Sequence, residues 1–345
     1  MIPPESSPAP RAHSGNPREQ ILAPTPDNLA LLAKQLQAGQ LIGVPTETVY
    51  GLAAHALDPA ACRAIFTVKG RPWVDPLIVH IPSVASAASW VVWNAEATLL
   101  AEAFWPGPLT MVLPSRGVIP PVVTAGGDSV ALRMPSHPIF QALMAVCAIP
   151  LAAPSANPFG YVSPTTAAHV RDSLGERVPW ILDGGDCSVG IESTIVDLRN
   201  PRSPVVLRPG AITPEQIAAV LQRTCRLASR AQSQETIMPG SLERHYSPRT
   251  PLVLVPHGGV PEKPLPPEVA LLLYRRPEKD SAWSSHRAVF WLTEDGDPEE
   301  AARHLFALLR KLDAGSWRHV WVESPPETPA HVALLDRLRR AATRS

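Results

Sequence analysis

Short apolar runs alternate with polar, proline-containing loops along most of this chain. From Leu41 the order is an apolar strand LIGV, a polar loop PTETVYGL, and a helix opened by Asp58 and Pro59 that ends near Val68. The strand LIVHI follows, and strands and helices keep alternating as far as about Gln222. This order is typical of an α/β domain with a mixed sheet.

The same periodicities predict the other elements of this domain. Apolar residues spaced three and four apart predict helices at about Ala95–Phe104, Pro138–Cys147, Thr165–Leu174 and Pro214–Gln222. Strands are expected at LTMVL, SVALR and PLAA, and near Ile181, Ile195 and Val206. Many of the 41 prolines follow these strands, where a strand gives way to a loop.

A second, smaller unit begins near Pro251. The stretch Arg226–Pro239 is polar and lacks apolar periodicity, which indicates a linker. Beyond it the strands LVLV, VALLLY, AVFWL and HVWVE alternate with helices at about Pro298–Leu312 and Pro329–Ala342, a Rossmann-like α/β pattern. We therefore divide the chain into a disordered tail (1–20), a first domain (21–227), a linker or lid (228–250) and a C-terminal domain (251–345).

Composition narrows the classes of function. The 345 residues, 45% of them apolar, suffice for two cores. Lys plus Arg and Asp plus Glu both number 31, so no overall charge favours a nucleic acid or a membrane as partner. The four cysteines stand far apart without a CxxC pair, which predicts buried thiols in a reducing compartment. No signal peptide or membrane span is evident, so we expect a cytoplasmic protein.

Four short runs carry the candidate chemistry, because they place hydroxyl and cationic side chains beside apolar strands. They are PTETVYG at Pro45–Gly51, KGRP at Lys69–Pro72, PSAN at Pro154–Asn157 and ESTI at Glu192–Ile195. Such groups at strand ends bind phosphates and carboxylates. Plainer interpretations stay open at this stage: PTETVYG could be a polar turn, and Lys69 and Arg71 could cap the helix that precedes them.

Other polar side chains fit the same picture. Arg133 and Arg208 end two strands and could clamp a carboxylate or a phosphate. Ser163 lies just before a helix, where it could face an anion or act as an ordinary N-cap. His80 stands alone in an apolar strand, which more often means a core residue. The chain has neither a GxxxxGK nor a GxGxxG loop, so a nucleotide would be held by dispersed cations.

The order of eight motifs resembles the L-threonylcarbamoyladenylate synthase family over roughly residues 21–227. They are PTETVYGL, KGRPWVDPLIVHI, FWPGPLTMVL, VALRMP, PSANPFG, SPTTAAHV, IESTIVDL and RPGAI. The segment GSLERHYSP and the C-terminal unit resemble the long, two-domain type, although the lysine and tyrosine that often precede HYSP are missing. The resemblance implies an open, twisted mixed sheet over a large cavity, plus a smaller Rossmann-like α/β domain.

The resemblance also implies an activity. The family makes L-threonylcarbamoyladenylate and pyrophosphate from L-threonine, bicarbonate and ATP, a nucleotidyltransferase reaction that begins the formation of threonylcarbamoyladenosine at position 37 of tRNAs. Mg²⁺ would accompany ATP, and no metal site of the protein's own is expected. A tRNA threonylcarbamoyltransferase would take the intermediate, while direct binding of tRNA stays open.

Carried over by motif, the family's site falls on residues of this chain. Threonine would be surrounded by Thr48, His80, Arg133, Ala153 and Ser193, with Arg133 on its carboxylate. ATP would be held by Arg71, Asp75, Ser129, Ser155, Ser163, Arg208 and Tyr246. Lys69 would lie beside the phosphates and, with Arg71, act in catalysis. Asp75 stands where many relatives carry asparagine, so its charge would oppose an anionic ligand.

Two other classes of protein remain as alternatives. A carbamoyltransferase of the hydrogenase-maturation kind has a related domain, but the cysteine-rich zinc segments and acylphosphatase domain expected there are absent. A non-catalytic RNA-binding module is disfavoured by the zero net charge.

His245 and Tyr246 in RHYSP follow the first domain and are expected to form a lid over the cleft.

Overall fold

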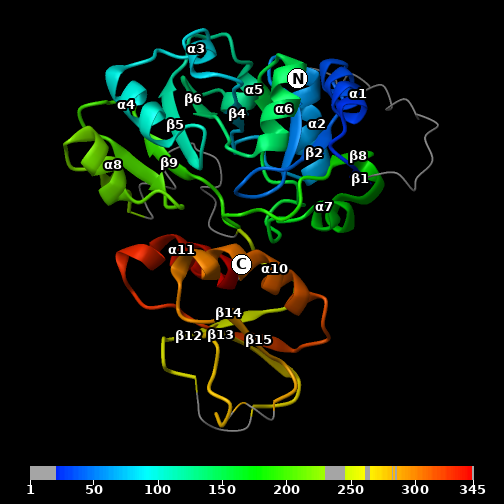
Figure 1. The fold of residues 1–345 in the computed structure, drawn as a ribbon, viewed down its shortest axis with the longest axis vertical. Coiled ribbons are helices and arrows are strands. Elements are labelled where there is room, and N and C mark those ends of the chain that lie inside the picture. The colour runs from blue at the N-terminus through cyan, green and yellow to red at the C-terminus, as the bar shows by residue number, and fades with distance from the viewer. Residues whose placement is uncertain (1–20, 230–244, 261–264, 282, 284–285, 344–345) are drawn as a thin grey trace, which may run out of the picture.

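The structure, a computed structural model, describes residues 21–229, 245–260, 265–281, 283 and 286–343. Within them the strands form two separate sheets, each with its own helices (Figure 1). The expected tail, 1–20, and most of the expected linker, 230–244, lie outside the described residues.

The first sheet has eleven strands in the described part of the chain and mixes parallel with antiparallel pairs, as expected. From one edge to the other its strands are β1 (Ile21–Leu22), β8 (Trp180–Leu182), β2 (Ile42–Val44), β3 (Gly51–His55), β7 (Leu151–Ala152), β4 (Ile78–His80), β6 (Ser129–Arg133), β5 (Leu109–Pro114), β9 (Thr194–Asp197), β10 (Val205–Arg208) and β11 (Arg226–Leu227).

Helices cover this sheet. They are α1 (Pro26–Gln37), α2 (Pro59–Lys69), α3 (Val84–Ala87), α4 (Ala95–Phe104), α5 (Pro121–Thr124), α6 (Pro138–Cys147), α7 (Ala167–Leu174) and α8 (Pro214–Leu221), with a 3₁₀ turn at Gly175–Arg177. Asp58 caps α2 as expected, since its carboxylate accepts the backbone N–H of Ala60 at 2.8 Å. Helix α1 was not predicted, although Thr25 caps it and Pro26 opens it.

Two expected boundaries are wrong. The loop PTETVYGL ends earlier than expected, because Gly51 already pairs with Val44 and begins the antiparallel strand β3. The linker does not begin at Arg226, because Arg226 and Leu227 form β11 beside β10. Strand β11 has only two residues, too few for an apolar pattern to predict it, and β3 is built mainly of Gly and Ala, which have low strand propensity.

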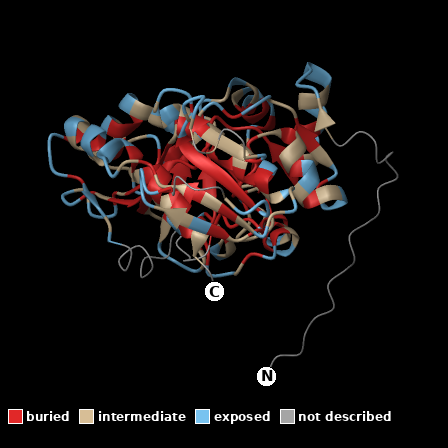
Figure 2. Ribbon diagram, turned by 90° about the horizontal axis from the view of Figure 1, so that it is seen from below, coloured by how far each residue is buried: buried red, intermediate tan, exposed pale blue. Residues whose placement is uncertain are grey.

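The core lies on both faces of the first sheet. Figure 2 shows the buried residues gathered toward the middle of the molecule and most of the exposed ones around its edge. On one face Leu32 and Leu36 of α1 pack with Phe140 and Leu143 of α6. Another cluster holds apolar side chains of α2, α4, α7 and α8, among them Phe66. Each large side chain buried in this way contributes about 1.5–3 kcal/mol. All four cysteines are free and buried, as expected.

The second sheet is smaller and its described strands all run parallel. Its order is β12 (Leu252–Val255), β15 (His319–Glu323), β13 (Val269–Arg275) and β14 (Val289–Thr293). Two helices, α10 (Pro298–Asp313) and α11 (Val332–Ala342, after a 3₁₀ turn at Pro329–His331), lie between this sheet and the first domain (Figure 1).

The two domains share an apolar core. Val49, Val162 and Ile191 of the first domain belong to the same buried cluster as Phe306 and Leu338 of the second. Gly190 also lies against α10, where an added Cβ would come within 2.4 Å of the Arg303 backbone. Their relative position is therefore fixed by close packing. No helix of the described residues combines the length and the apolar character needed to cross a membrane.

Candidate active site

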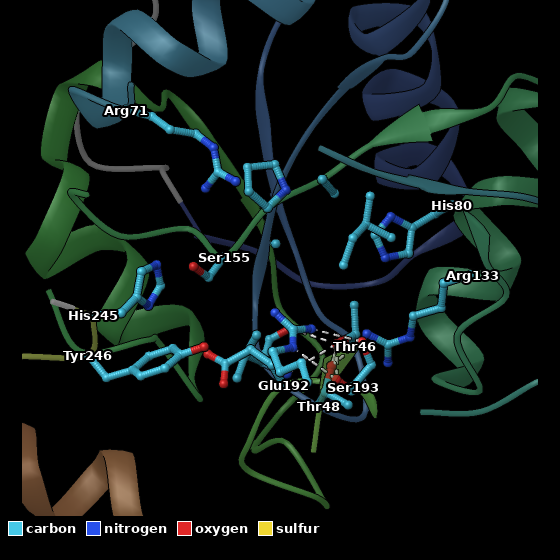
Figure 3. Close-up of a pocket in the computed structure, with 16 residues that line it drawn as sticks. Thr46, Thr48, Arg71, His80, Arg133, Ser155, Glu192, Ser193, His245 and Tyr246 are labelled. Atoms are coloured by element: carbon cyan, nitrogen blue, oxygen red, sulfur yellow. Dashed lines mark hydrogen bonds between the residues drawn. The ribbon is translucent and has the colours of Figure 1, made fainter. Parts of the chain in front are cut away.

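A cavity opens where several strands of the first sheet end. Its wall includes nine residues that the resemblance assigns to the site: Thr48, Arg71, His80, Arg133, Ala153, Ser155, Ser193, Arg208 and Tyr246. Figure 3 shows Arg71, Ser155, His245 and Tyr246 toward one side of this cavity and His80 and Arg133 toward the other.

Strand pairing explains why residues far apart in sequence meet here. His80 lies opposite Arg133 in the parallel pair of β4 and β6, so both stand at the carboxyl ends of their strands. Arg208 ends β10, and Ser193 immediately precedes β9, which pairs with β10. Carboxyl ends of strands in open α/β sheets are the usual place for ligands.

Arg133 is held by the PTETVYG loop. Its Nη1 donates to the Thr48 hydroxyl at 2.9 Å, and its Nη2 forms an ion pair with Glu47 at 2.8 Å. Thr48 in turn shares a hydrogen bond of 2.8 Å with Thr46. Since the Arg133 and Glu47 side chains are 5% and 6% exposed, each compensates the buried charge of the other. The loop is thus more than a polar turn.

His80 faces the same part of the cavity as a neutral ring. Burial, followed by the nearby charge of Arg133, lowers the pKa of His80 to about 3. Its Nδ1 has no hydrogen-bond partner among the described residues. The interpretation as a plain core residue is therefore incomplete, because the ring is buried but lines the cavity.

Arg208 fixes the position of Ser193. Its Nε donates to the Ser193 carbonyl and its Nη2 to the Ser193 hydroxyl, both at 3.1 Å. The same hydroxyl shares a hydrogen bond of 2.8 Å with Thr110. Burial lowers the pKa of Arg208. A ligand at Ser193 would therefore meet an oriented hydroxyl backed by a cation.

Arg71 pairs with Asp75 and does not cap α2. Its Nη2 lies 2.9 Å from the Asp75 carboxylate, and its Nε and Nη2 donate to the carbonyls of Asp75 and Pro76. The helix is ended by Gly70 in the left-handed conformation. Asp75 is buried but does not line the cavity, so its charge is compensated by Arg71 within the protein. Its predicted role in ATP binding stays a prediction.

Lys69 does not cap its helix either. Its ammonium donates to the carbonyls of Ser155 and Asn157, both at 2.6 Å, and so holds the PSAN loop in place. Burial, followed by the charge of Arg71, lowers the pKa of Lys69 well below its usual value. Lys69 lies behind the cavity wall, and its place beside the phosphates stays a prediction.

Two further residues assigned to ATP lie outside the cavity lining. Ser129 begins β6 and so lies at the opposite end of that strand from Arg133. Ser163 is not an N-cap, because Thr166 caps α7. The Ser163 hydroxyl instead donates to Glu192 at 2.6 Å. Contact of Ser129 and Ser163 with ATP stays a prediction.

Thr46, Glu192 and His245 also line the cavity. No binding role was predicted for Thr46 or Glu192, and His245 was predicted only as part of the lid. Glu192 and Thr46 stand inside the quoted motifs, so the motifs could have identified them.

Tyr246 adopts a positive φ of 63° and its ring stacks on Phe306. Burial raises the pKa of Tyr246, and burial together with nearby cations lowers that of His245.

The charge of the cavity favours an anionic ligand. Among the described residues three arginines, Arg71, Arg133 and Arg208, line it against a single carboxylate, Glu192. Within the same part of the chain, no three His, Cys, Asp or Glu side chains come together in a way that could hold a metal ion. The site can therefore orient and neutralise phosphates or carboxylates with arginines and hydroxyls.

Comparison with known proteins gives the family. A family model described as "Telomere recombination" matches residues 34–210, and one described as "Threonylcarbamoyl-AMP synthase, C-terminal domain" matches residues 212–343. Threonylcarbamoyl-AMP synthase of Pyrococcus abyssi is 38% identical over 91% of this chain and 94% of its own length. The chain belongs to the threonylcarbamoyl-AMP synthase family.

Further matches agree with this family. The threonylcarbamoyl-AMP synthase of Bacillus subtilis is 37% identical over 91% of this chain and 92% of its own length. The crystal structure of P. abyssi Sua5 complexed with L-threonine superposes with a TM-score of 0.83 at 35% identity, covering 93% of this chain and 97% of that one. The expected two-part α/β architecture is thereby confirmed. The exact domain limits, 21–227 and 251–345, stay a prediction.

The geometry of Arg133 leads to a first prediction. If its guanidinium binds the carboxylate of threonine, Arg133→Ala raises the KM for threonine far more than the KM for ATP. Serine, which lacks one methyl group, is a weaker substrate by roughly 1–3 kcal/mol. Steady-state kinetics with each substrate varied in turn measures both effects. Equal increases in the two KM values would remove Arg133 from the threonine site.

The neutral state of His80 leads to a second prediction. Unfolded His80 takes up a proton below its usual pKa of 6.5, whereas folded His80 does so only near 3. The free energy of unfolding therefore decreases as the pH falls from about 6.5 to about 3. His80 alone contributes up to about 1.4 kcal/mol per pH unit to this decrease. Urea unfolding of the protein and of His80→Gln at pH 7, 5.5 and 4 should show a shallower decline for the variant. Parallel declines would contradict a neutral His80.

Proposed function

We propose that this protein condenses L-threonine, bicarbonate and ATP to L-threonylcarbamoyladenylate and pyrophosphate, a nucleotidyltransferase reaction that serves threonylcarbamoyladenosine formation at position 37 of tRNA. The observation that carries the proposal is the single cavity that brings together Arg133, Thr48 and Ser193 with Arg71, Ser155 and Tyr246. These side chains supply cations and hydroxyls for a carboxylate and for phosphates within one site.

Threonine would occupy the side of the cavity formed by Arg133, Thr48 and His80. Arg133 offers a cation to the carboxylate, and the hydroxyls of Thr48 and Ser193 can bond the threonine side chain. The related P. abyssi protein has a crystal structure in complex with L-threonine, which supports threonine as a substrate. A neutral His80 can accept a hydrogen bond from the threonine amine without repelling it.

ATP would occupy the side formed by Arg71, Ser155, Arg208 and Tyr246. The amino nitrogen of threonine bonds to the carbon of bicarbonate with loss of water, and a carbamate oxygen then attacks the α-phosphorus. Pyrophosphate leaves as the bond between the α-phosphorus and its bridging oxygen breaks. Alignment of these groups and neutralisation of charge carry such a step, and the fixed arginines supply both.

Mg²⁺ fits this cavity as a companion of ATP more than as a resident ion. Glu192 is the single carboxylate in the described lining, and both of its oxygens already accept hydrogen bonds from Ser163 and Arg337. Mg²⁺ prefers phosphate oxygens and water in such sites. When bound, it would neutralise phosphate charge alongside Arg71 and Arg208.

His245 and Tyr246 would shield the intermediate from water. Both are buried against the cavity, and the Tyr246 ring stacks on Phe306 of α10 at 5.4 Å between ring centroids. An acyl-adenylate is readily hydrolysed, so exclusion of water protects it until a downstream tRNA threonylcarbamoyltransferase takes it.

Limited proteolysis tests this shielding. Cleavage by protease between Ala228 and Arg249 is expected to slow when ATP and threonine are both present.

The function itself is tested by product analysis. Purified protein incubated with threonine, bicarbonate, ATP and Mg²⁺ should yield threonylcarbamoyl-AMP by mass spectrometry and one pyrophosphate per product, because one cavity is lined by the groups proposed for both substrates. Omission of any one component is the control. Carbamoyl-AMP formed from carbamoyl phosphate would instead support a carbamoyltransferase. No product, together with salt-dependent RNA retention on a filter, would support an RNA-binding module.

Arg208 provides a sharper test of the charge argument. Arg208→Ala should lose on the order of 2–4 kcal/mol of transition-state stabilisation, measured as kcat/KM for ATP, while the protein stays folded. The matched control is Arg199→Ala, since Arg199 lies outside the cavity lining just after β9 and pairs with Asp197 at 2.7 Å, with 39% of its side chain exposed. Near-normal kcat/KM in a folded Arg208→Ala protein would show that Arg208 only orients Ser193.

A further inference from the structure

Two arginines of the second domain reach into the wall of the cavity. Glu192 is part of that wall, and its carboxylate accepts a short hydrogen bond of 2.6 Å from the hydroxyl of Ser163, which lies outside the lining. Arg310 of α10 donates from Nε to the Ser163 carbonyl at 3.2 Å and from Nη2 to the Val162 carbonyl. Arg337 of α11 donates from Nε to the other carboxylate oxygen of Glu192 at 2.8 Å. The second domain thus holds both members of this hydrogen bond.

Arg337 is the more central of the two. Its side chain has no solvent exposure, and its remaining nitrogens donate to the Glu192 carbonyl at 3.4 Å and to Asp336 at 2.7 Å. Its guanidinium carbon also lies 5.2 Å from the centre of the Tyr246 ring, a cation–π arrangement. One side chain therefore contacts the ESTI motif and the lid residue Tyr246 together.

The charge of Glu192 explains why this contact matters to the ligand. Glu192 is 7% exposed and is the single carboxylate in the described lining of a cavity that must accept polyphosphate. A buried carboxylate without a partner would repel such a ligand strongly, since charges interact more in the protein interior than in water. Arg337 approaches Glu192 from the second domain and compensates that charge.

We propose that Arg337 is a positioning residue for ATP binding, which neutralises and orients Glu192 and supports the ring of Tyr246. Arg310 assists by fixing the backbone of Ser163. The inference rests on the proposed function, because it takes ATP as the ligand. The C-terminal domain is accordingly part of the nucleotide site, in addition to covering it.

The test compares four full-length proteins by calorimetry with a non-hydrolysable ATP analogue and, separately, with L-threonine. They are the unmodified protein, Arg337→Met, the double variant Arg337→Met with Glu192→Gln, and Arg339→Met. Arg339 is the matched control, because it lies on the same helix and forms an ion pair with Glu327 in which the two side chains are 57% and 78% exposed. Thermal melting of each protein reports folding.

Arg337→Met is expected to weaken binding of the ATP analogue about tenfold or more, with a change in threonine binding of about twofold or less. The double variant should regain most of the lost affinity, because the neutral amide introduced by Glu192→Gln no longer needs a cation. A residue that merely joins the domains would not be rescued by removing the charge of its partner. Arg339→Met should match the unmodified protein.

Other outcomes decide against the proposal. Equal loss for both ligands in Arg337→Met, or a folded double variant that does not recover ATP affinity, would overturn it. If Arg337→Met alone fails to fold, the double variant still decides, since it buries no unpaired charge. If the unmodified protein binds threonine but no ATP analogue, the proposed function itself is refuted. If the unmodified protein binds both and only the Arg337 variants behave differently from expectation, the role of Arg337 alone is refuted.

Discussion

Burial of cations beside a ligand cavity is the constraint on which this structure depends. Arg71, Arg133 and Arg208 are all almost inaccessible to water, yet each has partners within the protein. Arg133 pairs with Glu47, Arg71 pairs with Asp75, and Arg208 donates twice to Ser193. Removal of one partner from a buried ion pair costs about 3–5 kcal/mol, because it leaves an uncompensated charge. The loops that carry Glu47 and Asp75 are therefore needed to keep the arginines charged and oriented.

The same constraint joins the two domains. The carboxylate of Glu192 is compensated by Arg337, which lies 145 residues later on α11. Arg310 binds backbone carbonyls of the YVSP segment from α10, and Tyr161 donates to Asp313 of the same helix at 2.8 Å. With apolar residues of both domains in one buried cluster, these contacts leave little freedom for independent movement. The second domain is best described as one wall of the site.

Much of the fold and part of the site could be predicted from the sequence. Strands end at proline-containing loops, so Arg133 and Arg208 could be placed at strand ends, and the sheet brings strand ends together. Thr48 and His80 were assigned to the site through the family resemblance. The partners of these residues were harder to find. The family motif predicts Asp75 as a charge facing the ligand, although its spacing of four from Arg71 permits an ion pair. The contact between Glu192 and Arg337 depends on how two domains pack, which local periodicity does not encode.

Neutral histidines complete the electrostatic design of the cavity. His80 lies beside Arg133, and His245 lies near Arg71 and Lys69, so burial and neighbouring cations lower the pKa of both rings. Neither ring adds a positive charge at neutral pH, so the cationic character of the lining comes from its arginines, which their protein partners hold in place. A constant field suits a reaction in which charge moves among carboxylate, carbamate and phosphates, because the donors need no rearrangement as the transition state forms.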